Sequence, residues 1–116
     1  MRYEEFQCED AEYLLVAYGT SARVCQKSVQ LARAQGMKIG LLRPITLFPF
    51  PSKRLNALAD KVKIMLSVEM SAGQMIEDVL LSVNGKVPVY HFGRMGGIVT
   101  TPEEVVVFLK SKIIGG

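Results

Sequence analysis

The chain has 116 residues, of which 49% are hydrophobic, and a formal net charge of +3, and this length is typical of one domain with a core of its own. No apolar stretch approaches the roughly 18 consecutive residues of a membrane span, the polar and acidic residues 1–12 do not resemble a signal peptide, and the basic residues are scattered rather than gathered into a stripe for nucleic acid. We therefore expect a cytoplasmic protein with no membrane and no nucleic-acid partner.

Cysteine usage excludes a further class of site. Cys8 and Cys25 are too few and too far apart for a metal knuckle or a disulfide framework. Both are therefore predicted to be reduced and structural.

Apolar runs and amphipathic segments alternate along the chain. The first run, residues 13–18, is apolar almost throughout, which is typical of a strand covered by helices on both faces of its sheet. Thr20 or Ser21 is predicted to cap the helix that follows, and Gly36 to end it. A second strand is predicted over residues 38–43.

The second half of the chain continues this alternation. Ser52 is predicted to cap a short helix, and strands follow over residues 62–69 and 87–92, with a helix between them. Pro88 cannot donate to a β-ladder and is expected at a strand start or a sheet edge. Thr101, followed by a proline and two glutamates, is predicted to cap the last helix.

The repeated order of strand and helix predicts an α/β fold. Right-handed crossovers between such strands build a parallel sheet with helices on both faces. Residues 13–116 are predicted to form this single domain. Residues 1–12 are expected to be either a linker or an added edge segment, because their alternation is too poor to decide between the two.

Candidate binding residues follow the predicted strands. Ligands of open α/β sheets meet the carboxyl ends of the strands, where Gly19, Thr20, Ser21, Arg43 and Arg94 are placed. The free N–H groups of a helix N-terminus can hold an anion, although neither G-x-G-x-x-G nor a P-loop lysine is present. Turn and cap chemistry explains the same residues, and a stand-alone anion- or nucleotide-binding module stays open as an alternative.

Candidates for catalysis are few. Glu69 is a lone carboxylate at a strand end, and His91, the only histidine, is expected to pack in the core. General acid–base chemistry usually needs a second titratable group beside the first. We therefore predict no catalytic, cofactor-binding or metal-ligating residue in this chain.

An apolar loop follows the second predicted strand and carries Phe48 and Phe50 between prolines. This loop either folds into the core of its own domain or packs on another domain, since rigid aromatic residues are enriched in interface cores.

Four motifs follow one another in a specific order. They read LLVAYGTSAR (14–23), GLLRPITLFPFP (40–51), VEMSAGQMIEDV (68–79), and FGRMGG (92–97) with TPEE (101–104). Together they resemble the C-terminal domain of the alpha subunit of 2-oxoacid:ferredoxin oxidoreductases, thiamine-diphosphate enzymes that act on pyruvate, 2-oxoglutarate or branched-chain 2-oxoacids. The resemblance covers about residues 9–110.

The resemblance implies a fold similar to the transketolase C-terminal domain: three layers, with a sheet of four to five mostly parallel strands and one antiparallel edge strand. It implies an assembly domain, inactive alone, in a complex that converts a 2-oxoacid to an acyl-coenzyme A and reduces ferredoxin. Thiamine diphosphate, magnesium and iron–sulfur clusters would lie elsewhere in that complex. The implied partners are a preceding pyrimidine-binding domain and other subunits. Eight residues are expected at this interface or at anion contacts: Gly19, Thr20, Ser21, Arg43, Phe48, Phe50, Glu69 and Arg94.

Overall fold

The computed structural model describes residues 3–45, 51–69, 75–93 and 101–115. The strands are β1 (Tyr3–Phe6), β2 (Tyr13–Ala17), β3 (Ile39–Pro44), β4 (Ile64–Glu69) and β5 (Val89–Gly93). The helices are α1 (Thr20–Ala34), α2 (Ser52–Ala59), α3 (Met75–Val83) and α4 (Pro102–Gly115).

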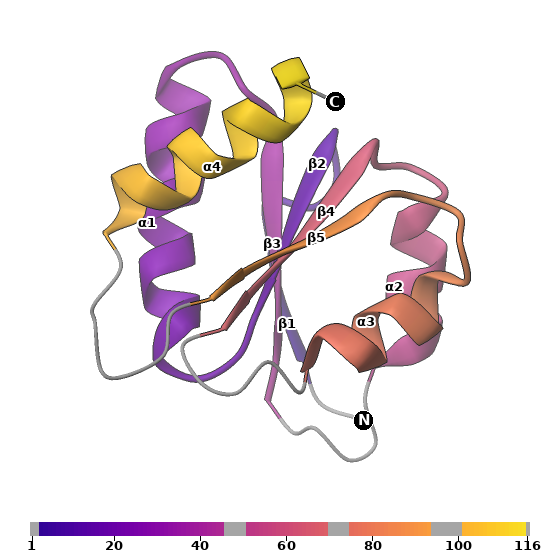
Figure 1. Ribbon diagram of the computed structural model, residues 1–116. Helices are drawn as coiled ribbons and strands as arrows, with labels where there is room; N and C mark the ends of the chain where they lie inside the picture. The colour runs from indigo at the N-terminus through magenta and orange to yellow at the C-terminus, as the bar shows by residue number, and fades with distance from the viewer. Residues whose placement is uncertain (1–2, 46–50, 70–74, 94–100, 116) are drawn as a thin grey trace.

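The described strands form one mixed sheet in the order β1-β3-β2-β4-β5. Strands β3, β2, β4 and β5 run parallel, whereas β1 pairs antiparallel with β3. Helices α1 and α4 cover one face, and α2 and α3 cover the other (Figure 1). The predicted three-layer α/β/α fold with one antiparallel edge strand is confirmed.

The core divides at the sheet into two apolar clusters, because side chains alternate between the faces of a strand. In β2, Leu14 and Val16 join the cluster under α2 and α3, whereas Leu15 and Ala17 join the one under α1 and α4. All four side chains are fully buried. Continuous apolar character in this strand therefore reflects burial on both faces, as its sequence predicts.

The start of α4 also follows its sequence. The N–H of Glu104 donates to Thr101 Oγ1 at 3.3 Å, and the N–H of Thr101 donates to Glu104 Oε1 at 3.3 Å. This reciprocal pair is a capping box, which satisfies N–H groups that the first helical turn leaves free. The predicted cap at Thr101 is confirmed.

The two other predicted caps are wrong. Helix α1 already includes Thr20, so the cap position falls on Gly19, which has φ +67° and provides no side-chain bond. Helix α2 already includes Ser52, and its cap position falls on Pro51, again without a side-chain bond. Both helices begin earlier than the hydroxyl pattern predicts, because packing of their apolar faces decides where they start.

His91 is exposed rather than packed in the core. Strand β5 is the outermost strand on its side of the sheet, so its residues are less completely covered than those of β2 or β4. The expectation that Pro88 lies at a strand start or a sheet edge is confirmed, since it directly precedes β5, which is an edge strand of the described sheet.

Candidate functional site

The four parallel strands end at one edge of the sheet. Their last residues are Ala17 in β2, Pro44 in β3, Glu69 in β4 and Gly93 in β5. Open α/β sheets place their binding and contact residues at this carboxyl edge. The described candidates from the sequence are accordingly brought to one side of the molecule.

The turn between β2 and α1 exposes Tyr18 and Gly19. Gly19 is exposed and adopts φ +67°, a conformation that glycine adopts most readily. Its carbonyl accepts a hydrogen bond from the N–H of Ala22 at 3.1 Å. Ser21 is only 2% exposed, whereas Tyr18 is 40% exposed. The described surface of this turn therefore includes the Gly19 backbone and the Tyr18 ring with its phenol group, whereas Ser21 is buried.

Arg43 lies next to the end of β3, and its guanidinium is turned toward β1. Its Nη1 donates to Glu4 Oε1 at 3.1 Å. Both residues line a surface pocket together with Glu5 and Gln26. Both carboxylates are ion-paired, Glu4 with Arg43 and Glu5 with Arg54, so the Arg43 guanidinium already has an anionic partner.

Polar residues gather at the carboxyl ends of β4 and β5. Ser67 is in register with His91, and Glu69 follows two residues later, so the three share one face of the sheet. Ser67 is fully buried and Glu69 is 7% exposed, whereas His91 is exposed. Glu69 and His91, which lie 22 positions apart in the sequence, are thus diagonal neighbours on adjacent strands.

Three of the predicted site residues lie outside the described residues. These are Phe48 and Phe50 of the apolar loop, and Arg94 after β5. Thr20 is the first residue of α1.

The donor set for a metal ion is incomplete in the described part of the chain. Within residues 3–45, 51–69, 75–93 and 101–115, no three His, Cys, Asp or Glu side chains gather closely enough to hold a metal ion. No described helix is both long and apolar enough to cross a membrane.

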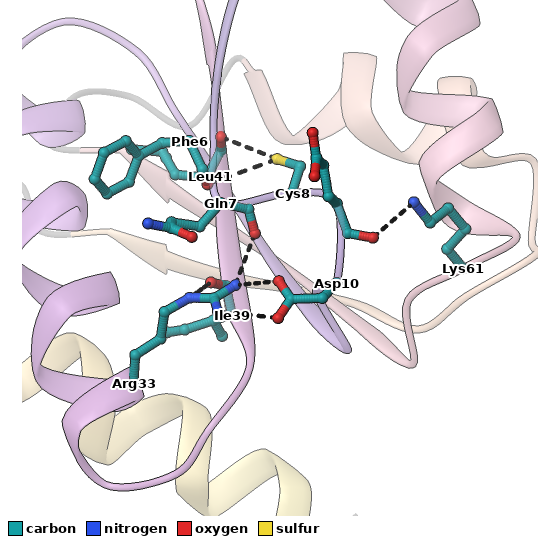
Figure 2. A network of polar contacts seen from close by, with 9 residues as sticks. Phe6, Gln7, Cys8, Asp10, Arg33, Ile39, Leu41 and Lys61 are labelled. Carbon is teal, nitrogen blue, oxygen red and sulfur yellow. Dashed lines mark hydrogen bonds and ion pairs between the residues drawn. The ribbon is translucent and has the colours of Figure 1, made fainter.

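Sequence reasoning missed the residues that tie the N-terminal segment to the domain. Arg33 in α1 contacts Asp10 and the backbone between β1 and β2 (Figure 2). One signal was available: Gly40 interrupts an otherwise bulky strand, which often marks close approach of another backbone.

Comparison with known proteins agrees with the architecture. The family model described as pyruvate:ferredoxin oxidoreductase core domain II matches residues 11–105. The chain belongs to this family. The resemblance carried by the four motifs is thereby confirmed, and the chain is homologous to subunits of 2-oxoacid:ferredoxin oxidoreductases.

Two curated relatives illustrate this relationship. Ketoisovalerate oxidoreductase subunit VorB of Methanothermobacter marburgensis is 56% identical over 97 residues, which are 84% of this chain and 27% of that protein. 2-Oxoglutarate synthase subunit KorA of Methanothermobacter thermautotrophicus is 33% identical over 103 residues, which are 89% of this chain and 27% of that protein. The chain thus spans about a quarter of the length of these relatives.

Solved structures match the fold closely at low sequence identity. A 2-oxoglutarate:ferredoxin oxidoreductase from Magnetococcus marinus, solved with 2-oxoglutarate, coenzyme A and succinyl-CoA bound, gives a TM-score of 0.82 at 21% identity. A split-gene transketolase, in an inactive beta4 tetramer, gives 0.82 at 15% identity. Both matches cover 97% of this chain, with 20% and 42% of the respective structures. The transketolase-like fold is therefore confirmed.

Proposed function

We propose that residues 13–116 form the C-terminal domain of an alpha-type subunit in a thiamine-diphosphate-dependent 2-oxoacid:ferredoxin oxidoreductase. In this proposal the domain helps to assemble the complex and performs no chemistry alone. The complex would oxidatively decarboxylate a 2-oxoacid, form an acyl-coenzyme A and reduce ferredoxin. The family match over residues 11–105 carries the proposal.

The choice among 2-oxoacids draws on the curated relatives. The identity to the ketoisovalerate subunit is 56%, against 33% to the 2-oxoglutarate subunit. This difference supports a branched-chain 2-oxoacid as the substrate of the whole complex.

The carboxyl edge of the sheet is the surface that we assign to assembly. Gly19 and Tyr18 are exposed there, and Phe48, Phe50 and Arg94 belong to segments that follow β3 and β5. An exposed aromatic residue beside polar groups suits an interface core with a polar rim. A preceding pyrimidine-binding domain and the other subunits are the partners that we propose for this edge.

The cofactors of the complex would be held by other domains. Iron–sulfur clusters are typically held by four thiolates, and the sequence has only two cysteines, Cys8 and Cys25. For thiamine diphosphate with magnesium, the family resemblance supports a site in other domains of the complex. We propose a cytoplasmic complex, because the free and buried Cys8 and Cys25 suit a reducing compartment.

The isolated chain provides the first test. It is incubated with thiamine diphosphate, magnesium and each of three 2-oxoacids: pyruvate, 2-oxoglutarate and 3-methyl-2-oxobutanoate. We expect neither turnover nor calorimetric binding of thiamine diphosphate. Turnover, or tight binding of the cofactor, would contradict the assembly role.

The assembled oxidoreductase that contains this domain provides the second test. Tyr18→Ala removes an exposed ring at the carboxyl edge, and Val107→Ala removes a 65% exposed side chain from α4 as the control. We expect Tyr18→Ala alone to shift the complex toward free subunits in native mass spectrometry, with the melting temperature of the isolated chain unchanged. Equal behaviour of the two variants would argue against this edge as the interface.

A further inference from the structure

Residues 3–12, which we call the strap, comprise β1 and its connection to β2. The strap is acidic, and cationic side chains from several elements meet it. Four of its carboxylates form ion pairs: Glu4 with Arg43, Glu5 with Arg54, Asp10 with Arg33, and Glu12 with Lys63. In addition, Lys61 Nζ donates to the carbonyl of Glu9 at 3.1 Å.

These contacts differ in how much each can contribute. An exposed ion pair typically stabilises a protein by about 0–1 kcal/mol, and the Lys63–Glu12 pair is exposed at both ends. Two of the pairs are bidentate: Arg54 donates from Nε and Nη2 to both carboxylate oxygens of Glu5, and Arg33 donates from Nη1 and Nη2 to those of Asp10. Arg33 is the less exposed of the two arginines, 24% against 36%, and it also donates to two backbone carbonyls.

The guanidinium of Arg33 donates hydrogen bonds to Gln7 and Asp10 of the strap and to Ile39 of β3 (Figure 2). Its Nη1 and Nη2 donate to the two carboxylate oxygens of Asp10 at 3.2 and 2.8 Å. Its Nη2 also donates to the carbonyl of Gln7 at 2.8 Å, and its Nε to the carbonyl of Ile39 at 3.0 Å. One side chain thus joins α1, β3 and the strap.

The backbone of the strap turns sharply at the residue that Arg33 holds. Gln7 has φ +58°, a left-handed conformation that is uncommon for residues other than glycine. Next to it Cys8 is 3% exposed, and its thiol donates to the carbonyl of Leu41 at 3.3 Å. Gly40 in β3 lies against this turn, with no room for a side chain.

We propose that Arg33 is the clasp of this strap: its guanidinium locks the turn at Gln7 and Asp10, and so keeps the antiparallel strand β1 paired on β3. The clasp thereby fixes the course of residues 3–12 along the edge of the sheet. It also keeps the edge of β3 covered, since an unpaired edge strand is a template for pairing with other chains. This inference concerns the chain itself and does not depend on the proposed function.

Amide hydrogen exchange on the 116-residue chain tests the proposal. Arg33→Lys keeps the positive charge but loses the planar fork that holds Asp10 and Gln7 together. We expect amides of the strap to exchange about tenfold faster or more, because hydrogen bonds to charged groups are the stronger class. Amides of β2 and β4 should keep the exchange rates of the unmodified chain.

Two further variants sharpen the experiment. Lys27→Arg on the exposed side of the same helix is the matched control, and it should leave strap exchange unchanged. Asp10→Asn retains one acceptor oxygen for Arg33, so its effect should fall between those of the control and Arg33→Lys.

Two results would overturn the proposal. Unchanged strap exchange in Arg33→Lys would show that β1 is held without the fork. An equal acceleration in β2, β4 and the strap would show that Arg33 supports the whole domain rather than this segment. Because Asp10 lies on the surface, 54% exposed, Asp10→Asn keeps the comparison informative even if Arg33→Lys destabilises the whole domain.

Discussion

The carbonyl of Gln7 occupies the space that a side chain on Gly40 would need. A β-carbon placed on Gly40 would come 2.8 Å from Gln7 O and 3.0 Å from Cys8 Cα, and both of these neighbours are backbone atoms. Backbone cannot swing aside as a flexible side chain does, so this position in β3 requires glycine.

The first prediction follows from this contact. Gly40→Ala should lower the free energy of unfolding by about 1–3 kcal/mol, as overpacking of a filled site does. Denaturant unfolding measures the loss, and hydrogen exchange should locate it in residues 3–12.

Gly36→Ala is the matched comparison. A β-carbon at Gly36 would meet nothing within 4 Å, but its φ is +87°. The cost there is backbone strain of about 1–2 kcal/mol, and faster exchange should appear at the end of α1 instead. Loss of strap protection in Gly36→Ala would contradict this assignment.

The second prediction concerns pH. The guanidinium of Arg33 donates to Asp10 and holds the pKa of that carboxyl below its ordinary value of 3.8, with Lys38 adding a smaller effect in the same direction. A carboxyl with a lowered pKa in the folded state stabilises that state above its ordinary pKa, and this contribution disappears as the pH falls through the lowered value.

The protection of the strap amides against hydrogen exchange should therefore be constant near neutral pH and should decrease below about pH 4. Hydrogen exchange corrected for its intrinsic pH dependence measures this change. In Asp10→Asn, the part of this decrease that protonation of Asp10 causes should be absent. A decrease that remains unaltered in Asp10→Asn would assign the effect to other carboxylates of the strap.

The third prediction concerns the two free thiols. Burial raises the pKa of Cys25 to about 12, and burial also raises that of Cys8, with the nearby Glu5 adding to the shift. The thiolate is the reactive form, so both residues should resist iodoacetamide in the native chain at pH 7.5. In denaturant both should react. Rapid stoichiometric labelling of the native chain would show that one of the thiols is accessible.

The fourth prediction compares two serines that are both fully buried. Within the described part of the chain, Ser67 Oγ has no hydrogen-bond partner. Ser28 Oγ, by contrast, lies 2.9 Å from the carbonyl of Val24 and 3.1 Å from that of Pro102, which joins α1 to the start of α4.

Ser67→Ala should thus leave the isolated chain equally stable or up to about 1 kcal/mol more stable, because an unsatisfied buried group is removed. Ser28→Ala should destabilise it by about 1 kcal/mol through the lost hydrogen bond. Thermal unfolding of the two variants measures the difference. A clear loss of stability in both variants, or a gain in both, would contradict this prediction.

The candidate site was only partly predictable. Sequence order places Arg43 and Glu69 at the ends of strands and Gly19 just after one, and parallel strands do bring them to one edge. Local patterns could not show that Arg43 pairs with Glu4, because that partner lies 39 residues away in the chain. They also misplaced His91, whose exposure depends on which strand ends the sheet.

The sequence by itself determined the elements and their class. The apolar run at residues 13–18 predicts a strand buried on both faces, residues 62–69 predict a further strand, and the Thr101-Pro102 pair predicts the start of α4. These signals are local, since each depends on residues within a few positions of one another. The family resemblance rests on equally local motifs.

Only the tertiary structure decided how residues 3–12 are used. Their weak alternation allowed either a linker or a strand, and pairing with β3 resolved the choice. The residues that hold them, Arg33 and Gly40, act through contacts across 23 to 33 positions of sequence. Such contacts form only when the chain folds. Neither residue of a pair identifies its partner in the sequence, because the two lie far apart along the chain.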